Sequence, residues 1–490
     1  MKHMKKLAAV LVSVLMSFAM MTTVFAQDGT YKLTLTGTAT GHTYEAYQIF
    51  TGDLSTNEKG DKVLSNVAWG TGVKYTGTES AADVAKALGD NTMTLAQLEE
   101  KLTLKTPAKT VESSKGSTVI GGLAAGYYLV KDQNGTQANK SDAYTKFIVQ
   151  VVGDTEAAIK SDVPTVVKKV KDTNDSEGTT SDWQDSADAD INDDVQYQIT
   201  GTMPNNIADY STYKYVFTDT MSKGLTYTAN NAKIKIGNTD VTGSFTEAVA
   251  KNGDSTVVTW TCDNLKGIEG VKLDENTNVV VTYTAKLNES AVIGAGGNPN
   301  TVNLTYSNNP NKGGDGETGK TPDDKNIVFT YKTVVNKVDQ SQKSLKGAAF
   351  KLEKKQSDGT YKEIKSFTAD DKTTTFEFTG LDDGDYKLSE TATPAGYNTI
   401  DPIKFTISAK HDTTSDDPKL TELSGNATTG VVTFTPDTAA GSLTTDVVNK
   451  KGATLPSTGG IGTTMFYVAG GLMVVVAGVL LAAKKKAEAK

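Results

Sequence analysis

The sequence of 490 residues carries a formal net charge of -8 at pH 7 and has an isoelectric point near 5.2. This acidic balance argues against nucleic acid or an anionic membrane surface as a partner, because either would select a basic face. The single cysteine, Cys262, excludes an intramolecular disulfide, and the three histidines (His3, His42 and His411) lie too far apart in sequence to suggest a catalytic triad or a histidine-rich metal site. We therefore expect no cofactor, no metal and no conventional enzyme active site.

Residues 1–26 have the pattern of a signal peptide. A basic start with Lys2, Lys5 and Lys6 precedes an apolar run at 7–21, and the segment ends in VFA, which suits signal peptidase. The chain is therefore expected to be exported. The remainder is long enough for about three domains.

The first predicted domain covers residues 27–160. Alternating polar and apolar stretches, such as 31–35, 126–130 and 146–152, are separated by glycine-containing turns, and this pattern is typical of antiparallel β-sandwiches. Apolar residues near helical spacing predict one helical region at 81–102.

The segment 44–50 (YEAYQIF) resembles the opening strand of the N-terminal domain of Gram-positive backbone pilins, and the resemblance continues along the chain. It implies an all-β fold of tandem immunoglobulin-like sandwiches between the signal peptide and a C-terminal sorting signal with a transmembrane helix. The first domain shows no lysine, acid and asparagine trio like those described below. We predict that it lacks an internal crosslink.

The second predicted domain covers residues 161–330 and begins just before Pro164, which cannot continue a strand ladder. In the following strand, at 166–172, Val166, Lys168 and Val170 share one face. If this face packs in the core, burial favours the neutral, nucleophilic amine of Lys168.

Two further strands of this domain could complete the chemistry. Asp219 lies in the stretch 215–221, and Asn300 opens the stretch 300–306. Burial raises the pKa of a carboxyl group, and a protonated carboxyl can polarise an amide while a neutral lysine displaces ammonia from asparagine. The arrangement resembles the D2-type isopeptide domain of pilins, which implies Lys168 on the first strand, Asp219 as the catalytic acid and Asn300 on the last strand. The alternatives left open are Asn303 and Asn308 as acceptor and Lys169 as nucleophile.

The acidic run 182–194 is interpreted as a solvated loop. Its spacing does not fit an EF-hand, which needs Gly at the sixth position and Glu at the twelfth, where this chain has Asp193 and Ile199. The run at 307–319, rich in glycine and asparagine, predicts a turn or a flexible loop.

The third predicted domain covers residues 331–450 and resembles a collagen-adhesin B-type repeat. The resemblance rests on the opening strand at 334–339, the segment ETATPAGY at 390–397 and the closing VVNK at 447–450. It implies that Lys337 attacks Asn449 while Glu390 shuttles the proton. The alternation agrees, because Leu388 and Glu390 share one strand face.

Residues 455–490 resemble the sorting signal of Gram-positive surface proteins. An LPSTG motif is followed by an uncharged stretch at 461–483, long enough to span a bilayer, and by a basic tail. The resemblance implies that sortase cleaves after the threonine of the motif and transfers its carboxyl group to an amine. The motif residues are Leu455, Pro456, Ser457, Thr458 and Gly459.

In backbone pilins the amine belongs to a lysine between the first two domains, usually in a motif like YPK. Lys160 holds that place here without the Tyr-Pro pair, and Lys169 and Lys171 are alternatives. The resemblance implies a structural shaft subunit, without enzymatic activity on other molecules, that is cell-wall anchored after a transient membrane stage. Its implied partners are class C and housekeeping sortases, identical subunits, minor pilins, peptidoglycan and a host surface ligand.

Two other functions compete with the shaft. An adhesin or tip pilin would bind host matrix or glycan, but the nearest match to a DxSxS metal motif, at 339–343, ends in Lys343. A surface enzyme is disfavoured by the scarcity of histidine and the lack of arginine.

Overall fold

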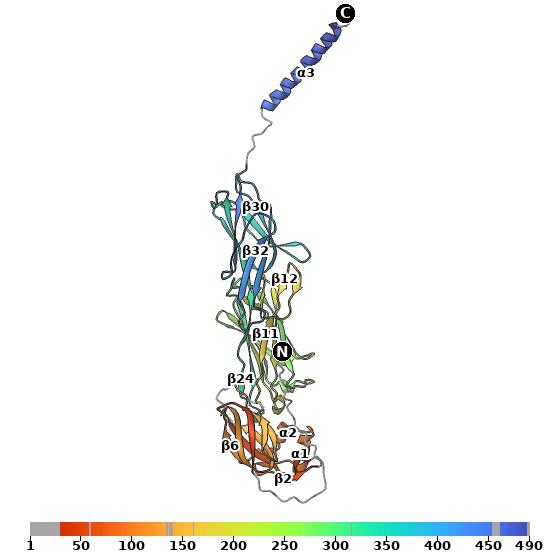
Figure 1. The fold of residues 1–490 in the computed structure, drawn as a ribbon, viewed down its shortest axis with the longest axis vertical. Helices are drawn as coiled ribbons and strands as arrows, with labels where there is room; N and C mark the ends of the chain where they lie inside the picture. The colour runs from red at the N-terminus through yellow and green to blue at the C-terminus, as the bar shows by residue number, and fades with distance from the viewer. Residues whose placement is uncertain are drawn as a thin grey trace.

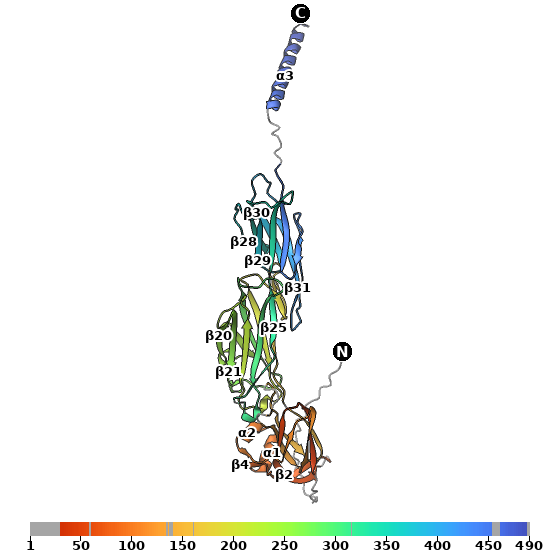
Figure 2. The same cartoon turned by 90° about the vertical axis from the view of Figure 1, so that its left-hand side faces the viewer.

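The computed structural model describes residues 30–57, 60–133, 136, 141–159, 161–314, 316–452 and 461–487. Three β-rich domains follow one another along the long axis, and helix α3 lies at the far end (Figure 1). A quarter turn gives the same order (Figure 2). The predicted signal peptide, Lys160 and the LPSTG motif lie outside the described residues.

Domain 1 is built on two sheets, β10-β1-β7 and β3-β2-β8-β9, with β6 paired to β2 and a separate β4-β5 pair. The central strand β2 is buried on both faces because it separates two apolar clusters, one under β1 and β7 and one under the helices. The elements are β1 (Tyr31–Thr38), β2 (Thr43–Thr56), β3 (Lys62–Trp69), β4 (Val73–Tyr75), α1 (Ala81–Gly89), α2 (Leu95–Glu99), β5 (Leu102–Leu104), β6 (Lys109–Glu112), β7 (Gly116–Leu123), β8 (Gly126–Asp132), β9 (Lys146–Val151) and β10 (Thr155–Ala158).

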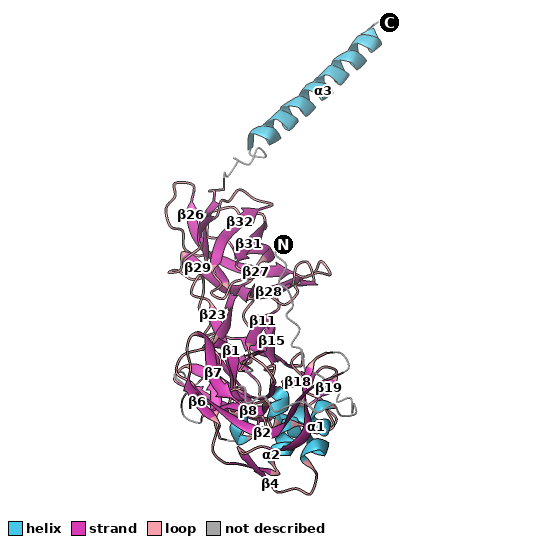
Figure 3. Ribbon diagram, turned by 60° about the horizontal axis from the view of Figure 1, so that its bottom comes forward, coloured by secondary structure: helices cyan, strands magenta, loops and turns pink. Residues whose placement is uncertain are grey.

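The helical region predicted at 81–102 is two short helices. Ser80 caps α1 by accepting a hydrogen bond from the Asp83 amide, and Thr94 forms a capping box with Gln97 that starts α2. The second cap restarts the helix, so the chain turns between the two. Among the described residues, the α-helices other than α3 lie in this domain (Figure 3).

Domain 2 is a sandwich of two sheets, β11-β15-β22-β18-β19 with β17, and β14-β25-β23-β16-β21-β20 with β24. The faces that meet carry one continuous apolar core. The elements are β11 (Val166–Val170), β12 (Thr173–Asn174), β13 (Thr179–Thr180), β14 (Ser186–Asp188), β15 (Asp194–Thr202), η1 (Ile207–Asp209), β16 (Tyr215–Met221), β17 (Leu225–Tyr227), β18 (Lys233–Ile236), β19 (Thr239–Asp240), η2 (Thr242–Ser244), β20 (Thr246–Asn252), β21 (Ser255–Cys262), η3 (Leu265–Gly267), β22 (Asn278–Leu287), β23 (Asn298–Ser307), η4 (Pro310–Lys312), β24 (Thr318–Lys320) and β25 (Asp324–Phe329).

The loop predicted at 307–319 contains η4 and the start of β24, so it is more regular than its composition indicates.

Domain 3 packs the sheet β29-β26-β34-β33 on the sheet β28-β27-β30-β31-β32. Its first and last long strands, β26 and β34, are parallel neighbours over eight residue pairs. The elements are β26 (Tyr331–Asp339), β27 (Ala349–Lys355), β28 (Tyr361–Ser366), β29 (Thr375–Leu381), β30 (Gly384–Ala392), β31 (Ile403–His411), β32 (Leu420–Ala427), β33 (Thr435–Asp437) and β34 (Ser442–Asn449).

The last strand of domain 2 runs almost directly into the first strand of domain 3, and we call these two strands the strand path. β25 ends at Phe329 and β26 begins at Tyr331, so only Thr330 separates them. Val328 packs in the core of domain 2, whereas Phe329 packs in that of domain 3. A connection this short, buried on both sides, couples the two domains tightly.

Beyond domain 3, α3 (Ile461–Ala487) contains a window, Tyr467–Lys485, with a mean hydropathy of 2.0 and none of its residues buried in the protein. Its length and composition suit a membrane span, as the sequence predicts.

Candidate functional site

The lysine of domain 2 lies on the buried face of β11. Val166, Lys168 and Val170 are buried while Val167 between them is exposed, as the alternation predicts. β11 pairs with β15 in one sheet, whereas Asp219 on β16 and Asn300 on β23 lie in the opposite sheet. The three side chains therefore meet between the sheets.

Their polar atoms form a closed network. Lys168 Nζ lies 2.5 Å from Asp219 Oδ1 and 2.6 Å from the Tyr283 hydroxyl. That hydroxyl donates to Asp219 Oδ2 at 2.6 Å and accepts from Asn300 Nδ2 at 2.8 Å. Asn300 Oδ1 is buried and has no hydrogen-bond partner among the described residues. The amide is therefore held by its nitrogen, with its carbonyl free to be attacked.

The surroundings favour a reactive amine. Lys168 and Asp219 have no exposed surface, and the rings of Tyr197 and Tyr283 each lie 5.1 Å from the lysine nitrogen. Burial lowers the pKa of Lys168, although Asp219 acts in the opposite direction. A lysine in this position deprotonates more readily than one in water.

The alternative residues of domain 2 point elsewhere. Asn303 donates to Asp323 at 2.9 Å, and Asn308 donates to the carbonyl of Asp142 in domain 1 at 3.0 Å. Lys169 pairs with Asp185. Among the candidate residues, Lys168 and Asn300 are the pair that shares one network, through the Tyr283 hydroxyl. Asn300 lies on β23, a late strand of the domain, and the last strand that the D2-type resemblance implies is instead β25.

The domain 3 cluster is built from different elements. Lys337 on β26 and Asn449 on β34 lie in the same sheet, where Lys337 is level with Val447 and Asn449 is two residues further along. Glu390 reaches them from β30 in the opposite sheet. The predicted trio is thus brought together by two parallel neighbours and one strand across the core.

Its contacts place the acid between the two nitrogens. Asn449 Nδ2 donates to Glu390 Oε2 at 3.0 Å and to the carbonyl of Asn398 at 2.7 Å, while Glu390 Oε1 lies 3.8 Å from Lys337 Nζ. Lys337 Nζ also donates to the Val447 carbonyl at 2.8 Å. Burial lowers the pKa of Lys337 to about 8, against the opposing effect of Glu390.

Sequence families agree with this architecture. The Gram-positive pilin backbone subunit 2, Cna-B-like domain matches residues 191–310, the prealbumin-like fold domain matches 332–419, and the LPXTG cell wall anchor motif matches 447–490. The trypsin-resistant surface T6 protein of Streptococcus pyogenes serotype M6 is 26% identical over 546 residues, covering 94% of this chain and 96% of that protein. Together these matches support a Gram-positive backbone pilin.

A solved pilin structure shows the same fold. The T6 backbone pilin of Streptococcus pyogenes, described as a modular three-domain structure, has a TM-score of 0.52 at 18% identity, covering 88% of this pilin and 100% of that chain. The major pilin SpaD of Corynebacterium diphtheriae has a TM-score of 0.47 at 20% identity, covering 87% and 98%. A backbone pilin is a subunit of a pilus shaft, and the anchor motif places this one at the cell wall.

The sequence reasoning missed Tyr283 of the pilin. It lies on β22, whose buried positions alternate from Val279 to Leu287, and nothing in that pattern separates it from an ordinary core tyrosine. Its hydroxyl gains three polar partners only because the sheet of β22 also holds β11 and packs against the sheet of β16 and β23.

A third buried lysine was also missed. Lys354 on β27 has no exposed surface, and its Nζ lies 2.7 Å from Asp190 of domain 2 and 2.9 Å from Asp382 of domain 3. Burial alone would lower its pKa, but these two carboxylates raise the pKa of Lys354 above its ordinary value. Its amine stays charged, so Lys354 joins two domains as an ion pair and is unsuited to nucleophilic attack.

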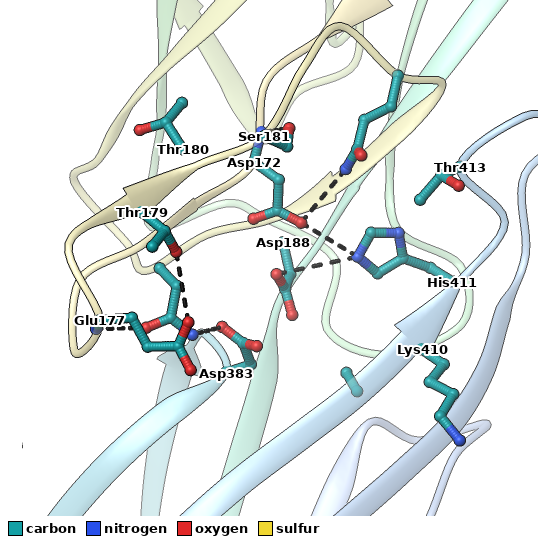
Figure 4. A pocket seen from close by; sticks show the side chains of 13 residues that line it. Asp172, Glu177, Thr179, Thr180, Ser181, Asp188, Asp383, Lys410, His411 and Thr413 are labelled. Atoms are coloured by element: carbon teal, nitrogen blue, oxygen red, sulfur yellow. Dashed lines mark hydrogen bonds and ion pairs between the residues drawn. The ribbon is translucent and has the colours of Figure 1, made fainter.

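The acidic run 182–194 is not the solvated loop that was predicted. It includes β14, which pairs in parallel with β25, and Asp188 and Asp190 are only 4% and 6% exposed. His411 of domain 3 lies 3.3 Å from Asp172 and 4.0 Å from Asp188 (Figure 4). The carboxylates are buried because domain 3 covers them, and no local sequence pattern encodes that contact.

Acidic residues at the joint, the contact between domains 2 and 3, form the groups of described residues that could hold a metal ion. Three groups bring one ligand atom from each member within 4.8 Å of one another. Lys354 and His411 supply positive charge in the same region. The prediction of no metal stays a prediction. The groups are Asp172, Asp188 and His411; Asp175, Asp190, Asp193 and Asp382; and Asp188, Asp382 and Asp383.

The proposed intermolecular linkage lies largely outside the described residues. Lys160 follows Ile159, the last described residue of domain 1, whose amide donates to the Thr36 carbonyl on β1. Of its alternatives, Lys169 is engaged with Asp185, and Lys171 lies 5.1 Å from the Trp183 ring.

In domain 1 the buried Lys146 pairs with Glu99 at 2.6 Å and donates to the Pro310 carbonyl, so it ties domain 1 to domain 2. The lack of a crosslink in domain 1 stays a prediction.

Proposed function

We propose that this pilin forms a covalent shaft in which a class C sortase joins Thr458 of one subunit to Lys160 of the next. A housekeeping sortase then links the last subunit to peptidoglycan, and minor pilins and a host surface ligand complete the partners. Two self-catalysed bonds, Lys168–Asn300 and Lys337–Asn449, brace each subunit. The observation that carries the proposal is that Lys168 and Lys337 are each buried beside an acid and an asparagine, in the domains between the two linkage points.

The bracing chemistry is simplest in domain 3. Glu390 can take a proton from Lys337, whose lowered pKa makes the amine available, and the amine then attacks Cγ of Asn449. Glu390 already accepts a hydrogen bond from Asn449 Nδ2, so it can pass this proton, and the second one that the lysine nitrogen loses as the amide forms, to Nδ2, which departs as ammonium. The reaction happens once and acts on the chain itself.

The path of tension through the shaft supports the same assignment. A pull between Lys160 and Thr458 passes through domains 2 and 3 and bypasses domain 1. In domain 3 the tension would enter along β26, pass through the bond from Lys337 to Asn449 and continue toward Thr458. Residues 338–448 would therefore carry no tension. In domain 2 the bond would shield 169–299, whereas 301–329 stay in the path, because Asn300 lies on β23 and not on the last strand. The domains in the path are those with a crosslink cluster.

Intact mass tests the two internal bonds. The mature chain, residues 27–458, should be lighter than its sequence by two molecules of ammonia, and Lys168→Met and Lys337→Met should each restore one. Lys354→Met is the matched control, a buried lysine between carboxylates, and should still lose two. A wild-type chain of full sequence mass would contradict both bonds.

Immunoblots of cell-wall extracts test the shaft. The wild-type pilin should give a ladder of high-mass bands, and Lys160→Ala should reduce it to monomer, while Lys169→Ala and Lys171→Ala keep the ladder. A single anchored band from the wild type would favour the adhesin alternative. A ladder that survives Lys160→Ala would place the acceptor on another lysine.

A further inference from the structure

The hydroxyl of Tyr283 is the centre of the domain 2 cluster. It lies 2.6 Å from Lys168 Nζ, 2.6 Å from Asp219 Oδ2 and 2.8 Å from Asn300 Nδ2. One oxygen thus contacts the nucleophile, the acid and the nitrogen that must leave. A core tyrosine usually needs a single polar partner for its hydroxyl.

A second tyrosine in the same cluster has no such role. Tyr197 stacks on Tyr283 with ring centroids 5.2 Å apart, and both rings lie 5.1 Å from Lys168 Nζ. Both side chains are buried, but the Tyr197 hydroxyl has no hydrogen-bond partner among the described residues. Both tyrosines place an aromatic ring beside the lysine, but only Tyr283 also places a hydroxyl among the reacting groups. Comparing the two residues therefore distinguishes the effect of the ring from that of the hydroxyl.

The two domains differ in how the acid reaches the asparagine. In domain 3, Glu390 accepts directly from Asn449 Nδ2. In the described part of domain 2, Asp219 contacts Lys168 and Tyr283, and Asn300 Nδ2 contacts Tyr283. The route from the acid to the leaving nitrogen therefore passes through the phenol.

We propose that Tyr283 is a catalytic residue of the domain 2 reaction, whose hydroxyl carries a proton between Asp219 and the departing nitrogen of Asn300. This inference rests on the proposed Lys168–Asn300 bond. It adds a fourth member to that cluster and gives the two crosslinking domains different proton routes.

The steps balance without any outside reactant. The Lys168 ammonium gives one proton to Asp219, and the neutral amine forms a bond to Cγ of Asn300. A second proton leaves the lysine nitrogen as the new amide forms, and the Cγ–Nδ2 bond breaks. Nδ2 receives both protons, with Tyr283 donating to it while accepting from Asp219. Ammonium departs, and the acid and the phenol end as they began.

The surroundings of Tyr283 suit a neutral relay. Burial, with Asp219 beside it, raises the pKa of Tyr283 well above its ordinary value. The group therefore remains a hydroxyl that can donate and accept in one transfer. It does not have to store charge in a buried site.

The test compares Tyr283→Phe with Tyr197→Phe in the mature chain. After a short pulse of expression, samples are quenched in denaturant at intervals, and intact mass with peptide mapping follows each bond. General acid–base groups contribute about 10²-fold or more, so Tyr283→Phe should slow the domain 2 bond by about 100-fold while Tyr197→Phe leaves it near the wild-type rate. The Lys337–Asn449 bond in the same chain is the internal reference for folding.

A second measurement covers the case in which Tyr283→Phe fails to fold. Site-specific 3-fluorotyrosine at 283 keeps the ring and the hydroxyl but makes the phenol more acidic. Because proton transfer responds to the acidity of the transferring group, the rate of the domain 2 bond at a fixed pH should then differ from the wild-type rate by about twofold or more, and the same replacement at 197 should leave that rate unchanged. Equal rates for the two Phe variants, or wild-type rates for both fluorinated chains, would overturn the role of Tyr283. A wild-type chain without the domain 2 bond would instead overturn the crosslink.

Discussion

Replacing Glu390 with Gln is the most informative single change in domain 3. It removes the carboxylate that accepts from Asn449 and faces Lys337, yet keeps the size of the side chain and both reacting residues. We expect the bond to fail, so that the mature chain loses one ammonia in place of two. The change thus isolates the crosslink from the packing around it.

The stability cost follows from the size of the closed loop. A Lys337–Asn449 bond closes a loop of about 110 residues, for which the chain-entropy relation for covalent crosslinks gives about 5 kcal/mol at 25 °C. A domain of about 120 residues unfolds with an entropy of about 0.25 kcal/mol/K. The melting temperature of domain 3 should therefore fall by about 20 °C.

Differential scanning calorimetry of the mature chain, with intact mass on the same sample, measures both effects. Asn449→Ala should also lower the melting temperature of domain 3, and the melting temperature of domain 2 should change little in either variant. An uncrosslinked Glu390→Gln chain whose transition stays within about 5 °C of the wild type would refute the entropic reasoning. Complete ammonia loss in that variant would refute the shuttle role of Glu390.

Two further predictions concern the joint between domains 2 and 3. Lys354→Met leaves two buried carboxylates without their cation and should destabilise the joint by about 3–5 kcal/mol, measured by hydrogen exchange of the strand path at 324–339. Lys355→Met, which breaks a half-exposed pair, should cost at most about 1 kcal/mol, and equal effects would contradict the ion-pair role. Burial raises the pKa of Asp188 to about 7, and neighbouring aspartates raise that of His411 against the effect of burial. Both groups bind protons more tightly in the folded joint than in the unfolded chain, so their stabilisation is complete at low pH and is lost as the pH rises through about 7. The urea midpoint of the joint should fall over that range and Asp188→Asn should flatten the change, whereas a rising midpoint would show the opposite linkage.

Local patterns predicted the strand and the buried face of the proposed crosslink residues where side-chain direction follows from strand alternation. The strand predicted at 215–221 coincides with β16, and Lys168 is buried because its neighbours at two-residue spacing are valines. The predicted single helix became two, because the caps at Ser80 and Thr94 outweigh the apolar spacing between them.

Contacts between distant segments could not be read in this way. The acidic run looked solvated because charged residues are rarely buried unless they are paired, and its cation, Lys354, comes from more than 150 positions later in the chain. Which asparagine faces Lys168 depends on the register of β23 against β16 and on the packing of the two sheets, and neither is a local property.

The sequence by itself determined the all-β class and the lysine faces, since both depend on short-range spacing, and its resemblance to known families indicated the domain 3 trio and the anchor. Only the tertiary structure decided that a phenol joins Asp219 to Asn300, that Lys354 is a charged clamp and not a nucleophile, and that domains 2 and 3 share one strand path. The physical reason is that pKa and reactivity are set by what surrounds a group in three dimensions. Two lysines with similar strand neighbours therefore differ in chemistry according to whether one carboxylate or two lie beside them.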